Sequence, residues 1–486
     1  MNSTHISNKS NKLISNLFWR FLERCGAQGI AFIVSLVLAR ILDPALYGTI
    51  ALVTVFITIM QVFVDSGMGN ALIQKKDADE LDFSTVFYFN ITVCVILYVV
   101  MFFTAPFIAS FYNRAELTPL VRVLSLSLII SGIKNIQQAY VSRKLMFRKF
   151  FFATLGGTIG AAIIGIWMAL KGFGVWALVA QNLFNMTIDT IILWITVKWR
   201  PKMMFSLIRL KVLFSYGWKL LVSALIDTAY NNLRSLIIGK LYTESDLAFF
   251  NRGKQFPNLI VSNINSSIDS VLLPTMSKVQ DDKKRVREMT SRAIKTSTYI
   301  MMPIMVGLAV CAEPIIKIIL TEKWLPAAFF LRIFCFTFAF YPIHTANLNA
   351  LKAMGRSDLF LKLEIIKKVV GLIVLLSTMF ISVEAMALSL LAISILSQII
   401  NSWPNRKLLD YGYRQQLKDM LPQIILSIAM GGCVFAIQFL KLNDILTLLI
   451  QVPLGICIYV LGSKMFHIDS YEYVLSIVKG FAKKKS

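Results

Sequence analysis

The chain has 486 residues, of which 57% are hydrophobic and only 16% are charged. Soluble domains are roughly 45–50% apolar and about 25% charged, so this composition excludes a cytosolic enzyme, a secreted disulfide scaffold and a disordered chain. In a soluble protein the net charge of +24 would suggest nucleic-acid binding. In a membrane protein the positive charges must first be examined for their distribution over the connecting loops. The sequence therefore predicts an all-α, polytopic membrane protein.

Fourteen apolar segments are long enough to cross a bilayer, which needs about 20 predominantly apolar residues for each helix. The first helix is predicted to be retained, because Arg20, Glu23 and Arg24 interrupt its apolar run and a cleavable signal peptide needs a continuous one. The connections are too short for a folded soluble domain. In chain order the predicted spans are 13–38, 46–68, 84–110, 117–138, 150–170, 173–197, 211–238, 246–273, 296–320, 325–350, 360–382, 384–403, 417–440 and 443–465.

These spans are predicted to form two six-helix lobes and an additional pair of helices. We expect an N-terminal lobe over 1–198, a C-terminal lobe over 199–405, and two further transmembrane helices with a basic cytoplasmic tail over 406–486. Val64-Asp65-Ser66 recurs as Ile268-Asp269-Ser270, one of several short strings repeated at an offset near 200 residues. An offset of six helices preserves orientation, so the lobes would be parallel repeats with a substrate between them near the midplane.

Lysine and arginine are distributed unevenly over alternate connections. With the N-terminus inside, the inside segments hold 32 of the 50 cations and the outside segments hold seven. This asymmetry is the positive-inside signal and predicts that both termini are cytoplasmic. Most of the net charge is therefore expected to set the topology and to say nothing about cargo.

Eleven cations remain, all within predicted spans, where a charge at mid-bilayer costs about 2.5–3.5 kcal/mol. Such residues must line a wet cavity, pair with a carboxylate or snorkel to the interface. We expect snorkelling for Arg122, Lys134, Lys367 and Lys368. The cations outnumber the carboxylates in the spans, so a cavity lined by both would be net positive and would favour an anionic cargo. The arginines that are hardest to explain by snorkelling are Arg20, Arg24, Arg234, Arg252 and Arg332.

Four carboxylates in the spans are candidates for coupling transport to an ion gradient: Asp65, Asp269, Asp227 and Glu364. An intramembrane carboxylate can titrate or bind a cation. Asp65 and Asp269 also admit a structural interpretation, in which they cap helices or pair with the basic loops that follow, at Lys75, Lys76 and Lys278.

No catalytic or metal motif stands out, and we expect neither an enzyme nor a cofactor, metal or nucleic-acid partner. The six cysteines lie in apolar segments without a CxxC spacing and are expected to be small core residues. Of the three histidines only His344 falls in a span, with no acidic residue four positions away. GxSxG, HExxH and P-loop patterns are missing, and no outside loop is long enough for a polysaccharide polymerase.

An ordered set of strings resembles a known family. The strings are ARILDPALYG at 39–48, FVDSGMGNALIQ at 63–74, RKLMFR at 143–148, GFGVWALV at 172–179, KWRP at 198–201, EKW at 322–324 and LKAMGR at 351–356. Together they resemble the polysaccharide transporter family of bacterial lipid-linked oligosaccharide flippases, the Wzx/WzxC type, within the multidrug/oligosaccharidyl-lipid/polysaccharide exporter superfamily. The resemblance covers roughly residues 10 to 465, although Phe249-Phe250 stands where the family has Gly-x-Tyr.

The resemblance implies a two-lobed transporter of the bacterial inner membrane. Its cargo would be a polyprenyl-pyrophosphate-linked oligosaccharide repeat unit, moved from the inner to the outer leaflet for exopolysaccharide, capsule, colanic-acid-like or O-antigen assembly, by alternating access coupled to an ion gradient. Membrane lipid and other polysaccharide-assembly proteins would be its partners. The alternative is a multidrug or small-molecule exporter of the same superfamily, although cationic drugs would favour a carboxylate-rich cavity.

The arginines suit a pyrophosphate, because guanidinium binds phosphate bidentately. The predicted pyrophosphate clamp therefore consists of Arg20, Arg24, Arg252, Arg234 and Arg332. Arg20 and Arg24 share one helix face, and Arg252 would enter from the other lobe. The resemblance to lipid II flippases, with cavity arginines on the first and eighth helices, favours Arg24 and Arg252 in particular. Polar side chains that could contact the sugars are Gln28, Asn182, Asn231, Asn232, Asn263 and Asn265.

Overall fold

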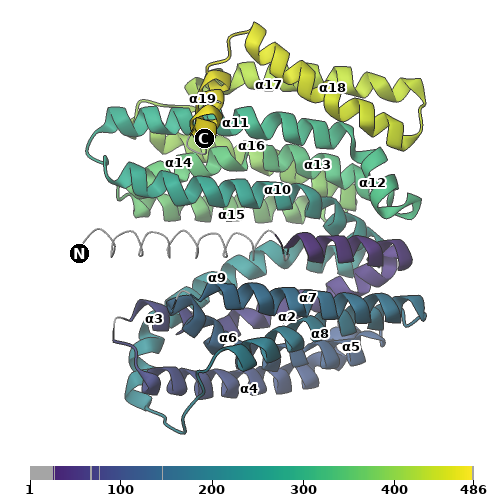
Figure 1. Cartoon of the computed structure of the whole chain (residues 1–486), viewed down its shortest axis with the longest axis vertical. Coiled ribbons are helices and arrows are strands. Elements are labelled where there is room, and N and C mark those ends of the chain that lie inside the picture. Colours follow the sequence, from purple (N-terminus) through teal and green to yellow (C-terminus); the bar gives the residue numbers. More distant parts are fainter. Residues whose placement is uncertain (1–25, 27, 66–67, 76, 145, 484–486) are drawn as a thin grey trace. The chain divides into compact units, whose positions relative to one another are not determined.

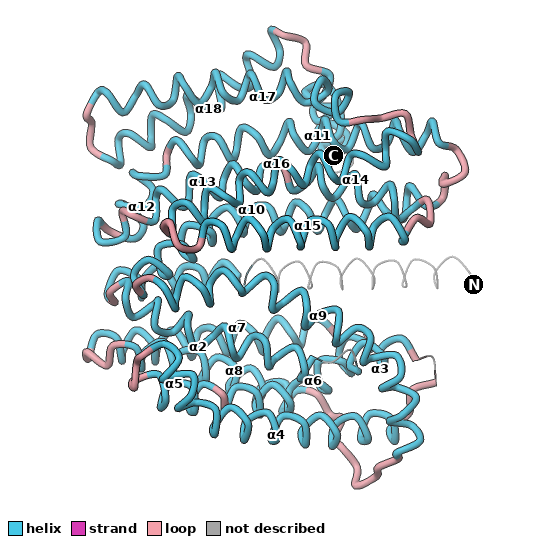
Figure 2. The backbone as a smooth tube through the Cα atoms, turned by 180° about the vertical axis from the view of Figure 1, so that it is seen from behind, coloured by secondary structure: helices cyan, strands magenta, loops and turns pink. Residues whose placement is uncertain are grey.

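The computed structural model describes residues 26, 28–65, 68–75, 77–144 and 146–483 (Figure 1). Every regular element among these residues is a helix, and no strand occurs in the described ranges (Figure 2). The all-α prediction is therefore confirmed. By their internal contacts the residues form two compact units, one ending at Leu247 and one beginning at Ala248.

The N-terminal unit contains the helix Gln28–Ile41 and eight labelled helices. They are α2 (Pro44–Asp65), α3 (Met68–Gln74), α4 (Glu80–Tyr112), α5 (Leu117–Leu124), α6 (Leu126–Arg143), α7 (Phe147–Leu170), α8 (Val175–Thr196) and α9 (Leu207–Leu241). The long α9 packs against α2, α3 and α4. It therefore belongs with the N-terminal unit by its contacts.

Helices α7 and α8 pack closely because α7 presents a face of glycines. A Cβ at Gly157 would lie 2.8 Å from the backbone oxygen of Asn185, and one at Gly160 would lie 2.5 Å from the end of Ile188. Without a hydrophobic drive between helices in lipid, such close backbone approach is what makes helices associate. Before α8 the chain turns at Gly172 and Gly174, whose φ angles of 81° and 55° suit glycine. The string GFGVWALV therefore contains the turn between α7 and α8.

A second close approach fixes the corner between α9 and α10 (Glu244–Ser277), the helix that crosses the unit boundary. Gly48 of α2 lies directly against the backbone of Glu244, with no room for a side chain. The Glu244 carboxylate pairs with Arg114, and Thr243 and Asp246 cap the start of the helix reciprocally. Gly48, within the string ARILDPALYG, thus has a packing role.

The C-terminal unit contains the rest of α10 and nine further α-helices. They are α11 (Lys283–Val310), α12 (Ala312–Leu320), α13 (Ala327–Ala339), α14 (Tyr341–Ala353), α15 (Ser357–Thr378), α16 (Val383–Leu408), α17 (Tyr413–Ala436), α18 (Asp444–Met465) and α19 (Asp469–Lys483). The central α11 contacts α13, α14 and α17, and α17 pairs with α18. The last two predicted spans therefore pack within this unit.

Large apolar side chains cover much of the outer surface, as a bilayer requires. Phe107 is 75% exposed, Ile195 74% and Phe439 76%. Ten of the described helices are long and apolar enough to cross a membrane, or up to eleven if the bent pair within α9 forms one span. The chain is a multi-pass membrane protein, and each of the fourteen predicted ranges overlaps a helix, but the count of fourteen spans stays a prediction.

Several details differ from the sequence-based expectation. The helices of the predicted spans 117–138 and 325–350 are interrupted at Ser125 and at Phe340, although Leu117–Arg143 and Ala327–Ala353 are each still long and apolar enough to form one span. Pro342 lies in the first turn of α14, where its missing N–H costs nothing. Helix α11 begins at Lys283, 13 residues before the predicted position 296. The predicted tail contains a helix, α19.

The predicted division at 198 and 405 stays a prediction. The compact units are separated between 247 and 248 because α9 packs on the N-terminal helices. The proposed six-helix repeats concern the ancestry of the chain, which these contacts do not address.

Candidate functional site

A cavity of about 540 Å³ lies inside the N-terminal unit, between α2, α6, α8 and α9. Most of its lining is polar, which is unusual among membrane helices and marks functional positions. The polar residues that line it are Thr54, Thr58, Gln61, Asp65, Ser127, Ser131, Lys134, Asn135, Gln138, Asn182 and Thr228. We refer to it as the polar cavity.

The helical repeat explains why these side chains converge. On α2, positions 54, 58, 61 and 65 are three or four residues apart and so share one face. On α6, positions 127, 131, 134, 135 and 138 follow the same spacing. The two polar stripes face each other, since α2 packs against α6. Polar stripes of this kind in otherwise apolar spans were the sequence signal that could have predicted the polar cavity.

Asp65 ends α2 and contributes a carboxylate to the polar cavity. Gln61 Nε2 donates to Asp65 Oδ1 at 3.3 Å, and Asn135 Nδ2 donates to the same oxygen at 3.2 Å. Asn135 also donates to the Val64 carbonyl at 3.0 Å, which ties α6 to the end of α2. Neutral amide donors therefore surround this carboxylate.

Lys134 and Asp189 form an ion pair at the same cavity, with Nζ and Oδ2 2.5 Å apart. The side chain of Lys134 is 18% exposed and that of Asp189 is 6% exposed. Gly157 of α7 packs against the Asp189 Cβ, so the glycine face of α7 also supports this pair. The expectation that Lys134 snorkels is therefore wrong: its ammonium is held inside the unit by a carboxylate from α8.

Lys75, which follows α3, pairs with Asp82 and not with Asp65. Lys75 Nζ lies 2.5 Å from Asp82 Oδ2, and Arg209 lies 3.6 Å from the other oxygen of this fully buried carboxylate. Asp79, just before α4, accepts the backbone N–H of Asp82, which lowers the pKa of Asp79 below its usual value. The structural interpretation of Asp65 thus loses Lys75 as a partner.

The predicted arginine clamp is only partly within the described residues. Arg20 and Arg24 lie outside them. Arg252, on α10, is 5% exposed; its Nη1 donates to Gln255 Oε1 at 2.7 Å, and its guanidinium lies 5.1 Å from the centre of the Trp324 ring. Trp324 belongs to the string EKW and is fully buried.

The other two arginines of the predicted clamp take different positions. Arg332 bridges α13 and α12, with Nη2 2.7 Å from Glu313 Oε1. Arg234 is half-buried on α9 within the N-terminal unit. Arg332 therefore has an internal partner that the sequence did not predict.

The remaining coupling candidates do not line the polar cavity. Asp269 is exposed within α10, eight residues before its end, whereas Asp65 is the last residue of α2. Asp227 is exposed on α9. Glu364 pairs with Lys367 one turn away, at 2.6 Å. Among the four, only Asp65 lies in a described cavity.

Two more of the predicted snorkelling residues have partners inside their unit. Lys367 pairs with Glu364, as above. Arg122 Nε donates to the Phe102 carbonyl at 3.2 Å, and its guanidinium lies 4.2 Å from the centre of the Phe102 ring. Fewer cations in the spans are thus left to snorkel than the sequence suggested.

Comparisons with known proteins agree with this arrangement. Residues 37–329 match the family described as polysaccharide biosynthesis protein. The teichuronic acid biosynthesis protein TuaB of Bacillus subtilis (strain 168) is 26% identical over 389 residues, covering 78% of this chain and 79% of TuaB. The lipopolysaccharide biosynthesis protein WzxC of Escherichia coli (strain K12) is 23% identical over 436 residues, covering 86% of this chain and 88% of WzxC.

The fold also matches a solved transporter. A structure of the lipid II flippase MurJ in an inward closed conformation aligns with a TM-score of 0.72 at 17% identity, covering 94% of this chain and 99% of MurJ. At that identity the likeness concerns the fold. The family match covers well over half of the chain and confirms the resemblance found in its strings. This chain is a member of the polysaccharide biosynthesis protein family.

Proposed function

We propose that this protein is a flippase that moves polyprenyl-pyrophosphate-linked oligosaccharide units across the bacterial inner membrane, from the inner to the outer leaflet. The observation that carries the proposal is a polar, charge-bearing cavity within a unit of membrane-spanning helices, in a chain of the polysaccharide biosynthesis family. A wet cavity in a lipid-facing bundle allows polar or ionic species to be handled at membrane depth. The fold of a lipid flippase supports the same conclusion.

We assign ion coupling to the polar cavity. Asp65 accepts hydrogen bonds from two amides and feels the positive charge of Lys134, which lines the same cavity and pairs with Asp189. A proton or a cation at Asp65 would change the charge of the cavity, and such a change can bias a transporter between conformations. The asparagine Asn135 would transmit it from α2 to α6.

The function is tested in a strain that lacks the gene. Lipid-linked repeat units should accumulate on the inner leaflet and surface polysaccharide should disappear, and the wild-type gene should reverse both effects. Normal surface polysaccharide together with increased sensitivity to hydrophobic cations would instead favour the drug-exporter alternative.

The predicted pyrophosphate ligands are Arg24 and Arg252. In the same strain, Arg24→Ala and Arg252→Ala should each reduce surface polysaccharide at least about tenfold, because a charged hydrogen-bond partner of phosphate contributes about 1.5–3 kcal/mol. Arg252→Lys keeps the charge but loses the bidentate geometry, so we expect an intermediate effect. Arg332→Lys serves as the control, since Glu313 already holds that arginine. Wild-type levels with both alanine variants at normal protein abundance would eliminate the clamp.

The topology is tested with reporter fusions. The positive-inside rule predicts cytoplasmic termini, with Lys283 inside and Lys441 outside. In the structure Lys283 begins α11 and Lys441 follows α17, two segments of the same unit. A cytoplasmic reporter should be active after Lys283 and a periplasmic one after Lys441; the opposite pattern would reverse the assigned orientation.

A further inference from the structure

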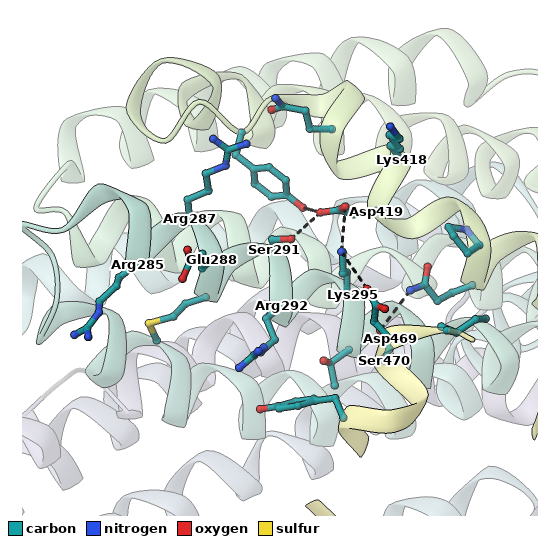
Figure 3. Close-up of a pocket in the computed structure, with 18 of the residues that line it drawn as sticks. Arg285, Arg287, Glu288, Ser291, Arg292, Lys295, Lys418, Asp419, Asp469 and Ser470 are labelled. Carbon is teal, nitrogen blue, oxygen red and sulfur yellow. Dashed lines mark hydrogen bonds and ion pairs between the residues drawn. The ribbon is translucent and has the colours of Figure 1, made fainter. Parts of the chain in front are cut away.

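An open groove of about 1080 Å³ lies in the C-terminal unit, away from the residues discussed above (Figure 3). It is formed by the end of α10, the first turns of α11, the start of α17 and the connection from α18 to α19. Five cations line it: Arg285, Arg287, Arg292, Lys295 and Lys418. Three carboxylates accompany them: Glu288, Asp419 and Asp469. We call it the basic groove.

Two of the three carboxylates are already used within the unit. Asp419 accepts the hydroxyl of Tyr411 at 2.6 Å and that of Ser291 at 2.7 Å, and Lys295 Nζ lies 3.4 Å from its other oxygen. Figure 3 shows Ser291, Lys295 and Asp469 gathered around Asp419. Lys295 is therefore balanced by this cluster, which joins α11 to α17 and α19.

Three of the other cations of the basic groove are not balanced in this way, whereas Arg285 Nε lies 3.8 Å from Asp282 Oδ2. Within the described residues, no carboxylate lies within ion-pair distance of Arg287, Arg292 or Lys418. Arg292 instead lies over the ring of Tyr473 on α19, 4.9 Å from its centre. The topogenic role of these charges requires only that they lie on the inside, so it does not explain why they converge on one cavity.

The basic groove adjoins a strip of exposed apolar side chains on the last turns of α18. Leu461 is 66% exposed, Met465 69% and Phe466 65%, and Phe466 itself lines the groove. Leu461 and Met465 are four residues apart and share one face. Next to the groove, α19 turns apolar side chains inward, with Tyr471 and Val474 packed against the cluster around Tyr299 and Tyr459. Positive charge and lipid-facing apolar surface thus meet at one place.

We propose that the basic groove binds the phosphodiester headgroup of an anionic phospholipid from the leaflet at that membrane face, with the acyl chains along α18. Basic pockets at the ends of membrane helices on the positive side recognise such headgroups. An acidic protein segment would need the cations but would gain nothing from Leu461 and Met465. The proposal is independent of the cargo of the transporter.

The test compares two double variants of the full-length protein in neutral detergent. Arg287→Gln/Lys418→Gln removes one arginine and one lysine from the groove, one on α11 and one on α17. The matched control, Lys284→Gln/Arg414→Gln, removes one lysine and one arginine from the same two helices at exposed positions outside the groove. Native mass spectrometry measures how many phosphatidylglycerol or phosphatidylcholine molecules each variant retains.

Wild type should retain phosphatidylglycerol over phosphatidylcholine, and the groove variant should bind phosphatidylglycerol about 25-fold more weakly, at about fivefold for each cation near a headgroup. The control should stay within about twofold of wild type. Glu288→Gln removes an exposed negative charge from the groove and should tighten binding, an effect that damage to the fold would not produce.

Three results would overturn the proposal. They are an equal loss in the control variant, no preference of wild type for phosphatidylglycerol, and displacement of the lipid by inorganic pyrophosphate at equal concentration. The last result would mean that the groove takes a soluble phosphate.

Discussion

Replacing Lys134 with methionine is expected to destabilise the protein by about 3–5 kcal/mol, the cost of leaving one partner of a buried ion pair alone. Lys134 Nζ forms an ion pair with Asp189, whose side chain is only 6% exposed. The second carboxylate oxygen of Asp189 is buried and accepts no hydrogen bond from the described residues. Without Lys134 this carboxylate would remain in a membrane helix with nothing to compensate its charge.

Replacing the other partner, Asp189, should reduce the stability of the protein less. Asp189→Asn leaves an ammonium that is 18% exposed and lines the polar cavity, where water can solvate it. We expect a loss of about 1.5–3 kcal/mol, the contribution of a hydrogen bond to a charged group. The Lys134→Met variant should therefore be less stable than Asp189→Asn, because Lys134 lines the cavity and Asp189 is more deeply buried.

The double variant Lys134→Met/Asp189→Asn completes the test. It removes both charges, so its stability should return to within about 1–2 kcal/mol of wild type, because a neutral replacement of a buried ion pair is often tolerated. Thermal unfolding of the purified protein in detergent, followed by loss of the monodisperse peak, ranks the four proteins. Additive losses in the double variant would show that the two side chains act separately and would contradict the pair.

The sequence was sufficient to locate the helices because the relevant signal is local. A run of about 20 apolar residues specifies a span by itself, and each predicted range overlaps a helix. The errors occurred where the signal weakens. Helix α19 was missed because its apolar residues occupy one face and its charges the other.

Pairing of charges was much less predictable, because it depends on which helices become neighbours. Lys134 and Asp189 are 55 residues apart, and Asn135 and Asp65 are 70 apart. Among the pairs formed by the intramembrane cations discussed above, that of Glu364 and Lys367 follows a local rule, the i, i+3 spacing on one helix. Treating each intramembrane cation singly therefore overestimated snorkelling.

The sequence predicted that an intramembrane carboxylate would form the candidate site, but it did not predict which carboxylate lies in a cavity. Asp65 was identified because it recurs as Asp269, yet the structure gives only Asp65 a cavity and hydrogen-bond donors. The difference arises from their helices. Asp65 ends α2 beside the polar stripe of α6, where two amides donate to it, whereas Asp269 lies within α10 and does not line the polar cavity. A sequence repeat preserves residue types but not the environment that each copy acquires.

Replacing Asp65 with asparagine is therefore expected to abolish translocation while the protein still folds. Asparagine keeps an oxygen that can accept from Gln61 and Asn135, so the contact between α2 and α6 should survive. It cannot carry a charge, so the cavity can no longer respond to a proton or cation gradient.

The measurement is gradient-driven movement of a lipid-linked oligosaccharide in vesicles made from cells that express each variant. Wild type should stop when an ionophore collapses the gradients, and Asp65→Asn should be inactive with or without the ionophore. Asp269→Asn is the matched control and should retain most of the activity, because Asp269 lines neither described cavity. Activity of Asp65→Asn that still follows the gradient would exclude Asp65 as the coupling residue. Equal loss in both variants would instead support two matching sites, as the repeat alone suggests.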